Sequence, residues 1–198
     1  MGEMTKKQLD IIRAACAVFE KHGYSGTGME TIAEAAGVSK RTLYKYYGSK
    51  EAVFSAIIKH LRQSATLKQC PRYQPGTSVR GQLVGVVYAM LAHLNREEHI
   101  RLARIIIAEV IREPKLSEIL SEAADFSKSA PFLWIRSAME DGQLRSEAPE
   151  KALTHLGGLV KSAVMWPRLF FCHAPLTEGE IRNLAEEYAD FFLSYYRL

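Results

Sequence analysis

The sequence lacks the features that mark several specialised classes of protein. Its three cysteines in 198 residues are odd in number and lie far apart, which excludes a disulfide framework and suits free thiols in a reducing compartment. No apolar run reaches the roughly 18 residues that a membrane span needs. The polar N-terminal segment has no apolar stretch behind it, so we expect no signal peptide, no membrane partner and a cytoplasmic protein.

Signatures of enzyme chemistry are missing as well. The sequence contains no Cys-x-x-Cys pair, no glycine-rich phosphate loop and no nucleophile elbow. The histidines have no neighbour at metal-ligand spacing except in the adjacent pair Cys172 and His173, which is poorly placed to hold one ion. We therefore expect no catalytic site, no metal site and no cofactor.

What is present is helical periodicity. Apolar side chains recur three or four residues apart over 83–94 and 181–195, and no convincing apolar and polar alternation predicts strands. A threonine followed three residues later by Gln or Glu, as at Thr5, Thr27 and Thr177, predicts a capping box that begins a helix. We expect an all-α fold of about nine helices, broken near Pro131 and kinked or ended at Pro167. The expected ranges are 5–22, 28–35, 39–46, 50–68, 78–94, 97–112, 115–141, 149–171 and 177–197.

The positive charge is concentrated in the first third of the chain. Residues 1–62 hold ten basic and six acidic side chains, whereas the remainder is balanced, and the formal net charge is +4. From 38 to 50 there are four basic residues and no acidic one. Such a local patch suits a polyanion such as DNA, although charge alone fits a solvated face of a helical bundle equally well.

Residues 28–47 predict two short helices joined by a tight turn. Ala33 and Gly37 are small enough for the helices to cross closely, and Val38 supplies an apolar contact, which is a helix-turn-helix arrangement. Leu43 and Tyr47 lie on the face of the second helix that packs inward. The opposite face carries Lys, Arg and Tyr, the residue types that a major-groove helix uses.

These residues carry a specific resemblance. The segment TIAEAAGVSKRTLYKYYGSKEAVF at 31–54 resembles the DNA-binding signature of TetR-family transcriptional regulators, and the chain from Ala14 through Gly23-Tyr24 is similar to that family's first helix and turn. The resemblance covers about residues 8–60. It implies a three-helix DNA-binding domain at 1–48 and a helical ligand-binding and dimerisation domain at 49–198. It also implies a homodimeric repressor that binds an inverted-repeat operator in double-stranded DNA and is released by a small molecule.

The resemblance also implies which side chains meet DNA. It puts Thr27 and Lys50 where helix N-termini meet backbone phosphates. Arg41 stands where the family often has a small residue, so it either reads a base edge or binds only phosphate. The helix that enters the groove begins at its N-cap Ser39 and supplies Lys40, Arg41, Thr42, Tyr44, Lys45 and Tyr46.

A ligand site is expected in the second domain, where 101–114 is similar to the C-terminal part of AefR-like regulators. The helix at 97–112 is apolar nearly all round, which predicts a central buried helix. Its charged residues then either face a polar ligand or pair with one another. The effector is expected to be largely apolar, and for each residue plain core packing is the alternative. The candidates are Met90, Leu94, Arg104, Glu109, Phe126, Trp134, Met165 and Trp166.

The last two long helices predict a dimer interface, because two helices from each protomer can form a four-helix contact about a two-fold axis. The alternative is that these faces bury only against their own domain. The expected contact residues are Leu153, Leu156, Gly157, Val160, Val164, Leu184, Tyr188 and Phe191.

Two other classes of function remain as alternatives at this point. A helical scaffold that has lost DNA binding is disfavoured by the intact basic pair Lys40 and Arg41. A small-molecule-binding protein or enzyme that uses a C-terminal cavity would need a converging set of polar residues, which the sequence does not display.

Overall fold

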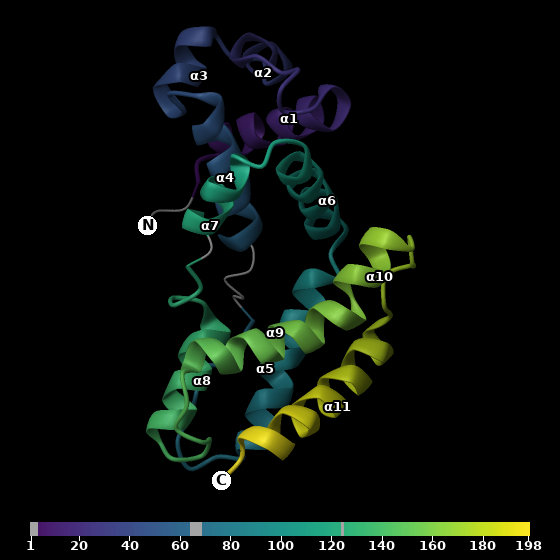
Figure 1. Cartoon of the computed structure of the whole chain (residues 1–198). Coiled ribbons are helices and arrows are strands. Elements are labelled where there is room, and N and C mark those ends of the chain that lie inside the picture. Colours follow the sequence, from purple (N-terminus) through teal and green to yellow (C-terminus); the bar gives the residue numbers. More distant parts are fainter. Residues whose placement is uncertain (1–3, 64–68, 124) are drawn as a thin grey trace. The chain divides into compact units, whose positions relative to one another are not determined.

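The computed structural model describes residues 4–63, 69–123 and 125–198, and it confirms the all-α prediction. Within these ranges there are eleven helices and no strand, with one isolated antiparallel bridge between Leu144 and Arg197 (Figure 1). The chain forms two compact units. Unit 1 comprises Met1–Gln63 and Arg101–Ala124, and unit 2 comprises Ser64–Ile100 and Asp125–Leu198. These contact-based units differ from the expected functional division at residue 48, which stays a prediction.

Unit 1 is built around an aromatic centre. The rings of Phe19, Tyr24 and Phe54 lie with their centroids 5.4 to 6.3 Å apart, and Ile32 and Leu43 are buried in the same core. The helices of this unit are α1 (Lys6–His22), α2 (Met29–Ala35), α3 (Lys40–Tyr46), α4 (Lys50–Gln63), the later turns of α6 (Glu97–Arg112) and α7 (Leu116–Ala123).

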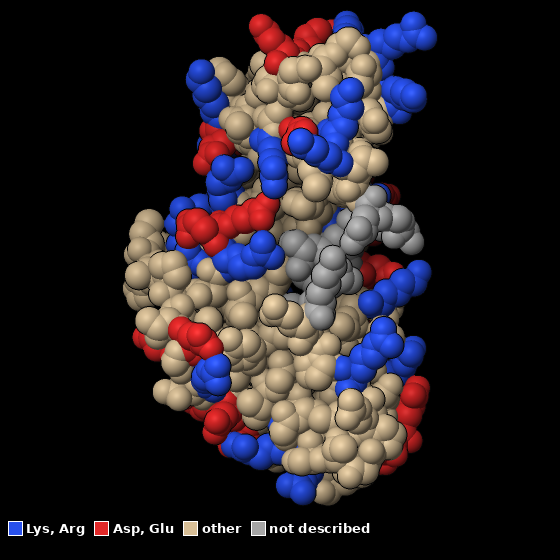
Figure 2. All heavy atoms as spheres, turned by 180° about the vertical axis from the view of Figure 1, so that it is seen from behind, with Lys and Arg blue, Asp and Glu red and all other residues tan. Residues whose placement is uncertain are grey.

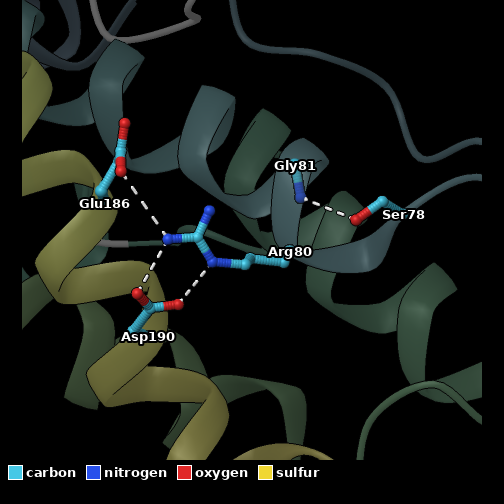
Figure 3. Close-up of polar contacts among 5 residues, drawn as sticks. All are labelled: Ser78, Arg80, Gly81, Glu186 and Asp190. Carbon is cyan, nitrogen blue, oxygen red and sulfur yellow. Dashed lines mark hydrogen bonds and ion pairs between the residues drawn. The ribbon is translucent and has the colours of Figure 1, made fainter.

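Unit 2 has its core between α5, α8, α9 and α11, where Trp134, Leu156 and Tyr196 are fully buried. Arg80 on α5 makes two hydrogen bonds of 2.7 and 2.8 Å to Asp190 on α11 and lies 3.7 Å from Glu186 (Figure 3). Because these charged groups are exposed, the ion pair adds little to the free energy of unfolding, and its main effect is to orient α5 and α11 relative to each other. The helices are α5 (Val79–Leu94), the first turn of α6, α8 (Ala130–Glu140), α9 (Pro149–Ala163), α10 (Met165–Phe170) and α11 (Glu178–Tyr196).

The count of about nine rises to eleven because two of the expected helices are each divided. The range 115–141 contains α7 and α8. Helix α8 begins after the N-cap Ser129 and has Pro131 in its first turn, where a backbone N–H would have no carbonyl partner within the helix, so proline is tolerated there. The range 149–171 contains α9 and α10. Pro167 has no N–H to donate to the carbonyl four residues earlier, that of Ala163, and α9 ends at that residue. The expected stretch 64–68 lies outside the described residues.

Two of the three expected capping boxes are confirmed, at Thr5 and Thr177, where both reciprocal hydrogen bonds are present. The third prediction is wrong. The N-cap of α2 is Gly28, and the Thr27 hydroxyl instead donates a 2.7 Å hydrogen bond to the carbonyl of Gly23. That hydroxyl therefore stabilises the turn after α1 rather than the start of α2.

The expectation that α6 is apolar all round is also wrong. Its inward stripe includes Leu102, Ile105 and Ile106, but Ile111 is 74% exposed and Arg104 lies on the surface. The helix is therefore amphipathic. Among the described residues no helix combines the length and the apolar character that crossing a membrane requires.

The capping box of α11 makes a stability prediction. Thr177→Ala removes the acceptor of the Glu180 N–H and should lower the free energy of unfolding by about 1 kcal/mol. Thr177→Ser keeps an acceptor and should stay close to the parent protein. Urea unfolding followed by circular dichroism measures both, and equal losses in the two variants would contradict the capping role.

Candidate nucleic-acid interface and ligand cavity

Helix α3 is anchored from one side and capped at its start. Leu43 is fully buried and Tyr47 is buried in the core of unit 1, as predicted. Ser39 accepts a 3.1 Å hydrogen bond from the Thr42 N–H. The turn before it needs Gly37, whose φ of +62° is the left-handed region. These contacts orient the outer face of α3.

The outer face of α3 presents basic and aromatic side chains to solvent. Tyr44 is 43% exposed, and Arg41, Lys45 and Tyr46 are also exposed. Arg41 and Lys45 form no ion pair with any residue that the structure describes. These are donors suited to phosphates and base edges. Figure 2 shows several Lys and Arg side chains in the upper part of the view, where Figure 1 draws α1, α2 and α3, with acidic ones among them.

Lys40 differs from its neighbours because it is paired within the protein. Its ammonium group contacts the carboxylate of Glu30 on α2 and lies 6.0 Å from the centroid of the Tyr44 ring. The hydrogen bond between the two groups raises the pKa of Lys40 and lowers the pKa of Glu30. Both side chains are exposed, so a phosphate can replace Glu30 as the partner of Lys40.

The remaining residues of the expected DNA set have internal partners. Thr42 shares a 2.8 Å hydroxyl contact with Ser39 at the start of α3. Lys50 donates hydrogen bonds to the carbonyls of Tyr24 at 2.7 Å and Thr27 at 2.9 Å, and its ammonium group lies 4.3 Å from the centroid of the Tyr24 ring. Thr27 is buried. The structure thus gives Lys50 and Thr27 a role in shaping the α1–α2 turn, and a phosphate contact of Lys50 stays a prediction that requires its third N–H.

Glu109 was expected at the ligand site, but the structure places it elsewhere. It is 3% exposed and lies in unit 1, where its carboxylate accepts a 2.8 Å hydrogen bond from the Tyr24 N–H and a 2.9 Å one from Arg112. The Ser25 hydroxyl donates a further 2.8 Å hydrogen bond to Glu113. The end of α6 therefore holds the turn between α1 and α2. The internal Arg–Glu pair was the alternative that the sequence left open.

Only glycine fits at one position of this turn. A Cβ at Gly26 would lie 2.4 Å from the His22 carbonyl oxygen, which no real side chain tolerates. The Tyr24 hydroxyl reaches Glu51 at 3.0 Å, and burial together with this hydrogen bond raises the pKa of Tyr24. The conformation of the turn therefore depends on the close backbone approach at Gly26 and on the side-chain contacts of Tyr24 and Lys50.

A cavity of about 220 Å³ lies in unit 2. Of the expected ligand residues, Met90, Leu94 and Phe126 line it. Trp134 is buried in the core, and Met165 and Trp166 lie on α10 and do not line this cavity. Arg104 and Glu109 belong to unit 1. The described residues that line it are Met90, His93, Leu94, Phe126, Ser129, Pro131, Leu153, Thr154, Gly157 and Lys161.

A pair of buried histidines includes one residue that lines this cavity. His93 lines it, is only 7% exposed, and meets the ring of His99 edge-on with centroids 4.7 Å apart. The Nε2 atom of His93 and the Nδ1 atom of His99 have no hydrogen-bond partner among the described residues. Burial, with help from the positive charge of Arg96, lowers the pKa of His93 to about 4 and that of His99 to about 3.

The expected dimer residues divide into two groups. Leu156, Val160 and Val164 are fully buried in the core of their own unit, Gly157 is buried, and the half-buried Leu153 lines the cavity, so these five residues lie on the inward side of α9. The alternative of burial within the domain holds for this part of the list. On α11, Leu184 and Tyr188 are half-buried and Phe191 is 63% exposed.

The Glu109 contact makes a prediction about the stability of unit 1. Glu109→Ala leaves the buried Tyr24 N–H without its acceptor and should lower the free energy of unfolding by about 1.5–3 kcal/mol. Arg112→Ala removes only the exposed partner of the same carboxylate and should cost less than about 1 kcal/mol. Urea unfolding of the two variants tests this, and equal costs would show that the backbone contact does not hold the turn.

Comparisons with known proteins agree with this geometry. The family described as bacterial regulatory proteins of the tetR family matches residues 11–57, and the AefR-like transcriptional repressor C-terminal domain matches residues 81–198. The regulator RutR of Escherichia coli (strain K12) is 41% identical over 58 residues, which is 29% of this chain and 27% of RutR. The matched part thus spans about a quarter of that relative.

Solved structures extend the likeness to the whole chain. A TetR family transcriptional regulator from Pseudomonas syringae pv. tomato str. DC3000 is 31% identical with a TM-score of 0.85, and the match covers 99% of both chains. The flavonoid-responsive regulator FrrA is 28% identical with a TM-score of 0.76, covering 97% of both chains. The matched families consist of transcriptional regulators rather than enzymes. The chain therefore belongs to the TetR family of transcriptional regulators and carries an AefR-like C-terminal domain.

Proposed function

We propose that this TetR-family regulator acts as a homodimeric repressor that binds an inverted-repeat operator and is released by a small molecule. The observation that carries the proposal is the outer face of α3, where Arg41, Tyr44 and Lys45 are exposed while Leu43 anchors the helix from behind. A helix held in this way can enter the major groove with its side chains already oriented. The proposal keeps 1–48 as the DNA-binding domain and 49–198 as the domain for ligand and dimer. Such a protein works where the chromosome is, in the cytoplasm.

Dimerisation follows from the small number of base pairs that one such helix reads. Two copies with a two-fold axis place their recognition helices about 34–36 Å apart, one turn of DNA. On α11, Leu184, Tyr188, Phe191 and Tyr195 follow helical spacing along one stripe that is half-buried to exposed. The neighbouring α9 has exposed Gly158, where an added Cβ would meet nothing. We assign the dimer contact to this pair of helices.

Helix α6 is a continuous helix with residues in both units, and it can transmit the effect of a ligand. This helix starts among residues of unit 2, where His99 packs against the cavity residue His93, and it ends in unit 1, where Glu109 holds the α1–α2 turn. A ligand that favours another position of α6 would shift the DNA-binding helices, and coupling of about 1–3 kcal/mol is typical of such linkage. The name of FrrA, flavonoid-responsive regulator, shows that a relative of similar fold responds to a small organic molecule.

Selection of bound fragments from random duplex DNA tests the central claim. We expect enrichment of an inverted repeat, with an affinity that falls steeply as salt rises because phosphate contacts release counterions. A folded dimer that enriches no sequence, with or without the ligands tested below, would favour the scaffold function instead.

Arg41 makes the sharpest prediction about DNA. Arg41→Ala should weaken binding to the selected operator by about 1–3 kcal/mol if the guanidinium pairs with a guanine, while binding to random DNA changes little. An equal loss on both DNAs would make Arg41 a phosphate contact. Arg136→Ala, a surface arginine on α8 that lies near Glu140, is the control and should leave both affinities unchanged. Fluorescence anisotropy measures all of these affinities.

The dimer is tested by mass. Light scattering should give a value near twice the 22.3 kDa of one chain. Phe191→Glu places a charge in the proposed contact and should shift the protein toward the monomer, whereas Leu133→Glu, at an exposed apolar position on α8, should not. A parent protein that is monomeric at micromolar concentration would refute this assignment.

A further inference from the structure

The cavity of unit 2 combines an apolar body with few polar groups. Met90, Leu94, Phe126, Pro131 and Leu153 supply hydrocarbon surface. The volume of about 220 Å³ is below the roughly 300 Å³ at which pockets for drug-sized ligands begin, which favours a molecule with a single ring or a short chain.

The electrostatics of the lining have one sign. Among the described residues of the lining, Lys161 on α9 is the single charged one, and none of them is Asp or Glu. Lys161 makes no ion pair with the residues that the structure describes. A cationic ligand would meet like charge there, whereas an anion would gain a charge-assisted hydrogen bond.

Each of the two hydroxyls of the described lining makes one hydrogen bond within the protein. Thr154 donates a 2.8 Å hydrogen bond to the Glu150 carbonyl, and Ser129 accepts the Phe132 N–H at 3.4 Å as the N-cap of α8. The Nε2 atom of His93 has no partner among the described residues, but it is closed off even from water, so a ligand in the cavity does not reach it. Lys161 is exposed and lines the cavity, so it is the charged group with which a ligand can pair.

We propose that the effector is a small organic monoanion, a carboxylate with an apolar ring or short chain, whose charged group pairs with Lys161. This inference rests on the proposed ligand-responsive function and names the chemistry of its ligand. A neutral molecule of the same shape would fill the cavity without gaining the ion pair with Lys161, so it should bind more weakly than the matching acid.

Acid and amide pairs test the class of ligand, because each pair has the same shape and differs in charge. The probes are benzoate, phenylacetate, 3-phenylpropanoate, indole-3-acetate and octanoate, each with its amide, titrated into the full-length protein by calorimetry at neutral pH. We expect at least one acid to bind about tenfold or more tightly than its amide, a difference that corresponds to about 1.4 kcal/mol.

Variants test whether Lys161 causes the preference for the acid over the amide. Lys161→Gln should remove the advantage of the acid over the amide, whereas Lys151→Gln, on the same helix but paired with Glu147, should keep it. Circular dichroism confirms that each variant is folded.

Three results would overturn the inference. They are equal binding of acids and amides, an acid preference that survives Lys161→Gln, and failure of every acid to bind. DNA binding is measured separately on the same preparations without ligand. Loss of operator binding with intact acid binding would refute the proposed repressor function alone, and intact operator binding without acid binding would refute the ligand class alone.

Discussion

A buried carboxylate and a partly buried ammonium group hold the turn on which the DNA-binding helices depend. Glu109 accepts the Tyr24 N–H, and Lys50 donates to the carbonyls of Tyr24 and Thr27. Three polar groups of the backbone between α1 and α2 are thus paired with side chains from α4 and α6. Without these partners the turn would bury unpaired polar groups, and α2 and α3 would lose their fixed start.

The recognition helix depends on this turn through packing. Leu43 and Tyr47 pack into a core that also contains Phe19, Tyr24 and Phe54. Because the inward face of α3 is fixed there, Arg41, Tyr44 and Lys45 are exposed together on the outer face. The face that we propose meets DNA is therefore a consequence of core packing, and a change in the α1–α2 turn can alter its orientation without altering any of its residues.

Unit 2 supplies a different chemistry. Its core between α5, α9 and α11 is apolar, and beside it lies a cavity whose described lining includes one charged side chain, that of Lys161. Interiors are normally close-packed, so an apolar hollow of this kind is a place where an apolar group of a ligand can be buried. The same unit presents the stripe of α11 that includes Tyr188 and Phe191, and we propose that this stripe contacts a second protomer.

Local signals in the sequence determined the all-α class, the helix-turn-helix, the capping boxes at Thr5 and Thr177 and the outward face of α3, because each depends on residues a few positions apart. Tertiary structure alone decided the rest. Glu109 meets Tyr24 across 85 positions of the chain, Lys50 turns inward, and Leu156 and Val160 face their own core rather than a partner. Apolar periodicity shows that a helix has a buried face, but what covers that face, and whether a buried charge meets a ligand or a backbone N–H, depends on contacts between distant segments.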